Sequence, residues 1–475
     1  MTQNQNEVMP SQQQQQEPAA AFKIITIPIP SLSEKEKEQF KSIYDLHSKN
    51  KKTLILAVLG LVGLLLPFAD LIYLPSLPRM IENLKTTETL GSLTVSICLL
   101  TSCLFGLLWG VISDCYGRKP VTLIGLTTFC LWTIGCRYSP NIYALLIFRG
   151  LQGCSISVSL VVGQAALADL YHPSERGRAM GIFYVFFFLG TILGPLIGGQ
   201  LAQHFNGWHS IFVFLSIFSF LITIIYFIFV PETLEFKVLH LYRKEITVVE
   251  KNENIENRPK LAKPWLPLIY LCDLTILPYI LVATMSFTAA FGCQTLHSSY
   301  LARTPYDYNE MMIGFLYIPI GIALFTGSFI GGKLADRAAS CKYFNNVAER
   351  RMIPGLILSL LLVPTGLILY GWSLEYGYNI LIIICGQCLF GLGQANRPGI
   401  LSYFTIKHQQ QAASIISANN FVQILFAAIG IAISIPASHR LGIGPFITIL
   451  ALVNIVTIVV AGVLIYKKIK SSPEQ

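Results

Sequence analysis

Long apolar stretches of about 20 residues recur down the whole chain, and they constrain its fold more than any other feature. A helix of about 20 residues crosses a hydrocarbon core of roughly 30 Å. In lipid every backbone amide must also be satisfied within the protein, which favours helices. The stretches therefore predict twelve membrane-spanning helices, with approximate bounds 54–77, 90–112, 120–138, 141–165, 179–203, 208–230, 267–300, 311–334, 353–372, 378–402, 412–436 and 441–466.

The composition agrees with a membrane protein. Of the 475 residues, 53% are hydrophobic and only 12% are charged, whereas about a quarter are charged in a typical soluble domain. The net charge of +9 does not indicate a nucleic-acid partner, because the excess lies in the predicted loops, where it sets membrane orientation.

Polar segments flank the predicted spans. Residues 1–52 include a glutamine run at 12–16 and predict a disordered cytoplasmic tail, with no cleavable signal peptide. Residues 467–475 form a second short tail. Most lysines and arginines lie in segments on one side of the predicted spans, which places both termini in the cytoplasm. The predicted outer loops hold only Arg79, Lys85, Arg137, Arg303 and Arg440.

A long charged loop follows the sixth span and divides the chain. We expect a six-helix bundle over 53–233, a cytoplasmic linker over 234–266 and a second six-helix bundle over 267–466. This arrangement of two six-span halves is a known transporter plan.

A short repeat supports the division. Gly110 and Asp114 stand at the inner end of the second span, and Gly332 and Asp336 stand at the same place in the second half, followed by Arg337. The spacing Gly-x-x-x-Asp thus recurs in both halves, and the fold class predicted is an all-α membrane protein with twelve transmembrane helices in two bundles.

The first copy continues into a recognisable loop. Gly110-Val-Ile-Ser-Asp114-Cys-Tyr-Gly117-Arg118-Lys119 resembles the loop signature of the major facilitator superfamily. The resemblance implies a latch between the two halves, built from Gly110, Asp114, Gly117, Arg118 and Lys119 and from Asp336 and Arg337 in the second half. Cys115 stands where that signature usually has arginine, so one basic residue of the latch is replaced.

Two further motifs lie within predicted spans. Arg149-Gly-Leu-Gln152-Gly resembles another signature of the superfamily. The segment 190–199 is similar to its antiporter signature, in which small residues allow close helix packing and a proline kinks the helix. The residues that carry this second resemblance are Gly190, Gly194, Pro195, Gly198 and Gly199.

Three shorter matches narrow the family. Leu74-Pro-Ser-Leu-Pro78, Pro231-Glu-Thr-Leu234 and Ile313-Gly-Phe-Leu-Tyr-Ile-Pro319 together resemble the fungal twelve-span drug:proton antiporters of the quinidine- and multidrug-resistance type, over roughly 54–466. The resemblance implies the major facilitator fold, export of small organic compounds against protons, and a plasma-membrane location. We expect a monomer. Glu235-Phe-Lys departs from those relatives, so the substrate group can differ.

Charged residues within predicted spans are functional candidates, because a charge in hydrocarbon is costly. At about 1.5 Å per residue, Asp70 and Arg149 lie at similar heights in the outer half of the membrane. We expect them to approach one another, with Asp70 as the proton-coupling acid. The alternative is a purely structural ion pair, and Asp70 stands one position farther from Pro75 than the acid of related exporters.

Arg397 lies near the inner end of the tenth span, beside Pro398, and is predicted to mark a kink or inner gate. Polar and aromatic side chains near mid-depth are candidates for a substrate cavity, although interhelical hydrogen bonding explains each of them alone. They are Tyr73, Gln152, Tyr184, Gln387, Asn419, Asn420 and Gln423.

These features predict a proton-coupled exporter and not an enzyme. No phosphate-binding Gly-x-x-x-x-Gly-Lys-[Ser/Thr] loop is present, so no cofactor is expected. Cys385 and Cys388 lie in an apolar span without histidine ligands, so no metal is expected. A proton-driven nutrient importer and a non-transporting receptor or sensor stay as alternatives, the first opposed by the antiporter-like segment and the second by the short tails.

Overall fold

The computed structural model describes most of the predicted spans. Within the described residues the secondary structure is helical. Residues 1–47 of the predicted tail, most of the predicted linker and residues 472–475 lie outside the described part. The described ranges are 48–205, 207–234, 237–238, 263–340, 348–407 and 412–471.

Twelve helical stretches of the described part are long and apolar enough to cross a membrane, as the sequence predicts. The first six are α2 (Lys49–Leu71) with η2 (Leu74–Ser76) and α3 (Leu77–Asn83), α4 (Glu88–Tyr116), α5 (Arg118–Arg137), α6 (Ile142–Leu170), α7 (Pro173–His204) and α8 (Trp208–Phe229). The second six are α10 (Leu277–Leu301), preceded by η3 (Leu266–Cys272), α11 (Glu310–Ser340), α12 (Ile353–Glu375), preceded by η4 (Ala348–Met352), α13 (Ile380–Leu392) with η5 (Gly393–Ala395) and α14 (Asn396–Lys407), α15 (Ala412–Leu441) and α16 (Ile443–Ser471).

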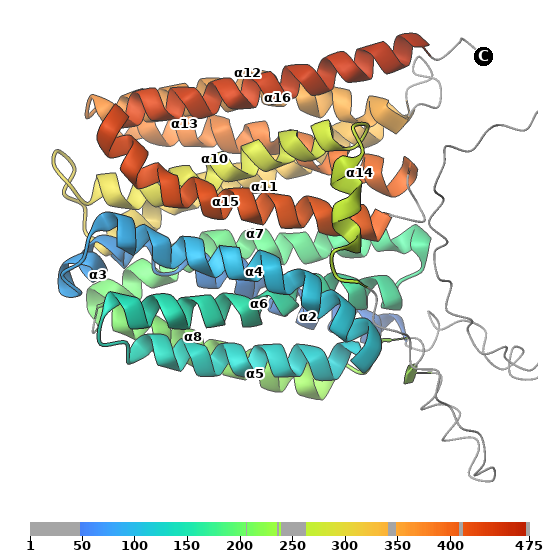
Figure 1. The fold of residues 1–475 in the computed structure, drawn as a ribbon, viewed down its shortest axis with the longest axis horizontal. Coiled ribbons are helices and arrows are strands. Elements are labelled where there is room, and N and C mark those ends of the chain that lie inside the picture. The colour runs from blue at the N-terminus through green and yellow to red at the C-terminus, as the bar shows by residue number, and fades with distance from the viewer. Residues whose placement is uncertain are drawn as a thin grey trace, which may run out of the picture. The chain divides into compact units, whose positions relative to one another are not determined.

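The helices pack as two groups of six. In the first group α4 and α5 pack on α6, and α2 packs on α7; in the second, α12 packs on α13 and α16, and α10 packs on α15. Figure 1 shows the blue-to-green helices of the first group beside the yellow-to-red helices of the second. The groups meet where α4 contacts α15 and α7 contacts α11, so these four helices form the main contact between the halves.

The first span is broken, whereas the sequence predicts one helix over 54–77. Helix α2 ends at Leu71, and the chain turns through Tyr73 into η2 and α3. Pro75 and Pro78 lack the N–H that would continue a helix, and each stands in the first turn of a new one. The break directly follows Asp70.

The seventh and tenth spans differ from prediction in the same way. The 3₁₀ turn η3 ends at Cys272. Oδ1 of the next residue, Asp273, accepts from Thr275 N at 2.8 Å before α10 begins beside Pro278. In the tenth span α13 stops at Leu392, and α14 begins after η5 with Pro398 in its first turn. Proline again interrupts the backbone hydrogen bonding, and the second break lies just before Arg397.

Ion pairs join the two halves at the end that holds residues 79–88, 301–310 and 439–443, which we call the predicted outer end. The Glu88 carboxylate on α4 pairs with Arg303, and its Oε2 lies 3.1 Å from Nε2 of His439 on α15. Arg79 Nη1 lies 3.1 Å from Glu310 Oε1 on α11. A partly exposed pair contributes about 0.2–1 kcal/mol, so together these contacts hold the predicted outer end closed with modest energy.

Replacing Glu88 by glutamine should open this end. The Glu88→Gln side chain keeps its shape but loses the charge that two basic residues of the other half share, so the closed state loses stability. We expect double electron–electron resonance between labels at Tyr138 and Tyr378, in a background without native cysteines, to show a larger long-distance population. Glu82→Gln removes an exposed carboxylate on α3 and serves as the control; equal distance distributions in both variants would contradict the clamp.

Candidate functional site

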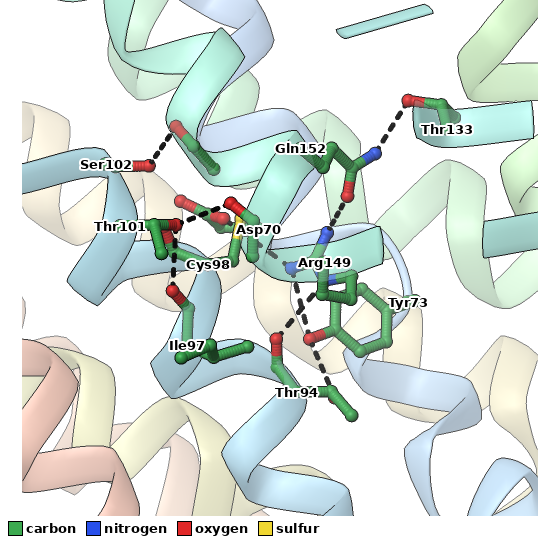
Figure 2. Close-up of polar contacts among 12 residues, drawn as sticks. Asp70, Tyr73, Thr94, Ile97, Cys98, Thr101, Ser102, Thr133, Arg149 and Gln152 are labelled. Carbon is green, nitrogen blue, oxygen red and sulfur yellow. Dashed lines mark hydrogen bonds and ion pairs between the residues drawn. The ribbon is translucent and has the colours of Figure 1, made fainter. Parts of the chain in front are cut away.

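A carboxyl group and a guanidinium group face each other inside the first half. Asp70 is the second-last residue of α2, and Arg149 lies in α6. The Asp70 Oδ1 and Arg149 Nη2 atoms are 3.7 Å apart, and the two residues are only 1% and 0% exposed. Figure 2 shows the two side chains pointing toward one another. The structure thus brings together the two charges that the sequence places at similar heights.

Several polar groups hold the Arg149 side chain in place. Its Nε donates to Thr94 O at 3.2 Å, its Nη1 donates to Gln152 Oε1, and its Nη2 donates to Tyr73 Oη at 3.2 Å. Gln152 Nε2 in turn donates to Thr133 Oγ1 at 2.7 Å. Figure 2 shows this network around the guanidinium. Tyr73 and Gln152, which the sequence suggests as cavity residues, are fully buried and position Arg149 instead.

Asp70 is less completely bound than its partner. Its Oδ1 makes no hydrogen bond among the described residues, and the thiol of Cys98 lies against the carboxyl group. On its other side Asp70 lines a cavity. The same carboxyl group therefore touches the buried cation and the space between the halves.

That cavity is bounded by helices of both halves. Tyr184, Asn420 and Gln423 line it, as the sequence suggests, and the Tyr184 hydroxyl accepts from Gln164 Nε2 at 3.0 Å. Its walls are otherwise mainly apolar, and it encloses about 20 Å³ in this conformation. The remaining lining residues, apart from Asp70 and Arg397, are Leu66, Pro67, Leu99, Ser102, Leu160, Phe187, Phe287, Phe291 and Ile424.

Arg397 also lines the cavity, although the sequence places it near the inner face and apart from a substrate site. Its Nη2 donates to Gln423 Oε1 at 3.0 Å, and its guanidinium lies 5.0 Å from the ring centre of Phe287. Asn419 Oδ1 accepts a hydrogen bond from Gln423 Nε2 at 3.0 Å and so helps to orient that amide. A gating role for Arg397 stays a prediction.

Gln387 lies elsewhere, in the core of the second half. Its Nε2 is 2.9 Å from His297 Nδ1, and His297 is fully buried against the rings of Tyr317 and Tyr370. Sequence reasoning missed His297. The rule that singled out Asp70, an ionisable side chain inside an apolar span, applies to histidine and would have found it.

Three glycines of α7 allow its backbone to pack closely against the backbone of α2 near Asp70. A Cβ on Gly190 would lie 2.7 Å from Leu64 O, one on Gly194 would lie 3.2 Å from Phe68 O, and one on Gly198 would collide with Ile72 O. The glycines and their partners both recur every four residues, so the two backbones run in contact along one face.

The other face of the same helix meets the second half. A Cβ on Gly199 would lie 3.2 Å from Gly314 Cα in α11, and one on Gly314 would lie 2.5 Å from Pro195 O. The antiporter-like segment therefore has two functions in the fold: it supports the end of α2 and it forms a backbone contact between the halves.

The loop signature is held within the first half in this structure. Gly117 turns the chain with φ 99°, in the region that favours glycine. Arg118 pairs with Asp114 and Asp169, and its N–H donates to Glu232 Oε1 at 2.8 Å. The loop signature thus binds the Pro-Glu-Thr-Leu motif at the end of the sixth span.

The remaining latch residues are less constrained. A Cβ on Gly110 would meet Val161 only at ordinary van der Waals distance, and Lys119 Nζ donates to Phe227 O at 2.8 Å. In the second half Asp336 and Arg337 are exposed near the end of α11. Their part in a latch between the halves stays a prediction.

No metal-binding cluster of three or more histidine, cysteine or acidic residues occurs in the described ranges. Cys385 is exposed and Cys388 is half-buried, and both are free thiols.

Adding one methyl group at Gly198 should destabilise the first half. In Gly198→Ala the new Cβ meets the Ile72 carbonyl, so α7 or α2 must shift, and overpacking of this kind costs about 1–3 kcal/mol. We expect a lower thermal midpoint for the purified protein in detergent. Gly181→Ala is the matched control in the same helix, because nothing lies within 4 Å of its Cβ position; equal midpoints for both variants would contradict close packing at Gly198.

Comparisons with known proteins agree with this geometry. The chain is 25% identical to the MFS antiporter QDR3 of Candida albicans, over 84% of this chain and 75% of that protein. It is 28% identical to the multidrug transporter DTR1 of Candida glabrata, over 87% and 84% of the two chains. A partially occluded inward-open structure of the xylose transporter XylE from E. coli superposes with a TM-score of 0.65, at 15% identity, over 90% of this chain and 99% of that one.

The family profile of the Major Facilitator Superfamily matches residues 59–431, which is most of the chain. The match agrees with the twelve apolar helices and with a transporter rather than an enzyme. This chain therefore belongs to the major facilitator superfamily of membrane transporters.

Proposed function

We propose that the protein is a proton-coupled exporter of small organic compounds in which Asp70 carries the exchanged proton. The observation that carries the proposal is the position of this carboxyl group, between the buried Arg149 and the cavity shared by the two halves. Arg149 stabilises the ionised form of Asp70, and the mainly apolar wall of the cavity favours its neutral form. A group in this position can bind and release a proton as access to the cavity changes.

Alternating access follows from how the halves meet. A central cavity between two bundles is the arrangement of secondary transporters, in which the bundles rock about a site near the midplane. The contacts at the predicted outer end, through Glu88 and through Gly199 with Gly314, support a state closed on that side. Separation of these contacts then exposes the cavity to the outer face.

Export is the direction favoured by the similar proteins, since one is named an antiporter and another a multidrug transporter. The segment 190–199 also resembles the antiporter signature. The substrate is accordingly a small organic compound, and the proton is the coupling ion.

The charge asymmetry of the loops supports a cytoplasmic position for both termini, and the resemblance to fungal drug antiporters supports a plasma-membrane location. We propose a monomer as the working unit, since each chain contributes both halves of the cavity.

Asp70→Asn should abolish transport driven by a pH gradient. The amide keeps the size of the side chain but cannot exchange a proton at neutral pH. Proteoliposomes are screened with cationic drugs, weak organic acids and polyamines under an imposed gradient. For each substrate that the wild type concentrates, we expect the variant to fall to the level of empty vesicles while retaining counterflow without a gradient.

The exposed Asp307 supplies the matched control, because Asp307→Asn makes the same chemical change in a loop at the predicted outer end. Full gradient-driven accumulation by Asp70→Asn would refute the coupling role. Vesicles of defined orientation decide the direction: substrate uptake into inverted vesicles with an acidic lumen supports export, and the opposite dependence supports an importer.

Both chain ends should be found on the same side of the membrane. The expectation rests on an even number of spans and on the distribution of lysine and arginine. Protease protection of epitope tags at the two termini of the full chain, in sealed cells and in permeabilised cells, measures this. Tags on opposite faces would contradict the twelve-span arrangement.

A further inference from the structure

Arg397 is a cation on the wall of the cavity with no carboxylate partner in the part of the chain that the structure describes. Its interactions there are the hydrogen bond to Gln423 and the contact with the Phe287 ring. A guanidinium has five N–H donors, and one of its terminal nitrogens accounts for the hydrogen bond described. Most of its donor capacity is therefore available to a ligand.

Asp70, the other charged residue that lines the cavity, already has a partner of opposite charge. Asp70 lies beside Arg149, whose donors bind Thr94, Gln152 and Tyr73. With Asp70 ionised, that pair is neutral overall. The remaining charge in the cavity is the positive charge of Arg397.

A cation in a low-dielectric cavity is costly unless an anion accompanies it. Planar guanidinium groups bind carboxylates through two parallel hydrogen bonds. Aromatic rings cover the neighbouring walls, from Phe187 of the first half and from Phe287 and Phe291 of the second. Asn420 and Tyr184 add polar residues to the lining of the same cavity.

The breaks in the helices place this arginine where it lies. Helix α13 ends at Leu392, and α14 restarts at Asn396, so Arg397 stands in the first turn of a half-helix. Helix amino-termini favour negative charge. The amide of the neighbouring Asn396 is 1% exposed, and neither of its polar atoms has a partner among the described residues.

We infer that the cavity selects organic anions: compounds with a carboxylate that binds Arg397 and an aromatic or other apolar body that packs on the phenylalanine rings. The inference rests on the proposed function, because it takes this cavity to be the substrate site. It narrows the substrate class from small organic compounds in general to amphipathic acids.

Three probes with one skeleton test the head group: naphthylacetate, naphthylethanol and naphthylethylamine carry an anion, a neutral hydroxyl and a cation on the same ring. Binding to the purified full chain is measured by isothermal titration calorimetry in detergent at neutral pH. We expect the carboxylate to bind at least about tenfold more tightly than the other two, as one charge-assisted contact provides. Equal affinities, tighter binding of the amine or no binding of the carboxylate would overturn the inference.

Substitutions then test whether Arg397 causes the preference for the carboxylate. Arg397→Gln should remove it, and Arg397→Lys should retain part of it, because lysine keeps the charge but not the planar fork. Arg440→Gln is the matched control, since it removes an exposed guanidinium at the predicted outer end of the same half. If Arg397→Gln still prefers the carboxylate, the assignment of the preference to this residue is overturned. If that variant does not fold, the affinities of Arg397→Lys and of the wild type for the three probes decide.

The outcome is separable from that of the proposed function. Gradient-driven export of the amine, lost in Asp70→Asn, would uphold proton-coupled export and overturn anion selection. The protein can instead prefer carboxylates through Arg397 while its transport does not depend on the pH gradient. That result would uphold anion selection and refute proton coupling.

Discussion

The pairing of Asp70 with Arg149 is the interaction on which the first half is organised. Two charges in a membrane-spanning bundle are costly unless each compensates the other, and removing one partner of a buried pair costs about 3–5 kcal/mol. The surrounding structure meets this requirement. The chain breaks after Asp70, so that Tyr73 reaches the guanidinium, while α4 supplies the Thr94 carbonyl and α6 supplies Gln152.

A second contact, between the loop after α4 and the end of the sixth span, holds the same half together at its other end. Glu232 lies where a side chain on Gly117 would be, and it binds the Arg118 backbone. Two motifs that are more than a hundred residues apart in the sequence thus form one contact. The first six helices are fixed at both ends, at the ion pair and at this loop, so the first half is suited to move as a unit.

Much of this was predictable from the sequence. Apolar length defined the spans because the bilayer fixes that length, and helical rise placed Asp70 and Arg149 at one height. The cavity was predicted less well, because depth does not tell which way a side chain points. Tyr73, Gln152 and Gln387 lie at suitable depth but face the interior of a half. Arg397 lies beside the predicted kink, where α14 begins, and it also lines the cavity, which a count of residues along the span does not reveal.

The contact between Gly199 and Gly314 joins the halves without interleaved side chains. Interlocking knobs and holes must unlock through rotamer changes before two helices part, whereas smooth backbone surfaces can part and meet again directly. The interface at this point is therefore a smooth backbone contact that can separate without rotamer changes. Any side chain at Gly199 or Gly314 would meet the opposite backbone, so variation at either position would hold the two helices apart and weaken the closed state.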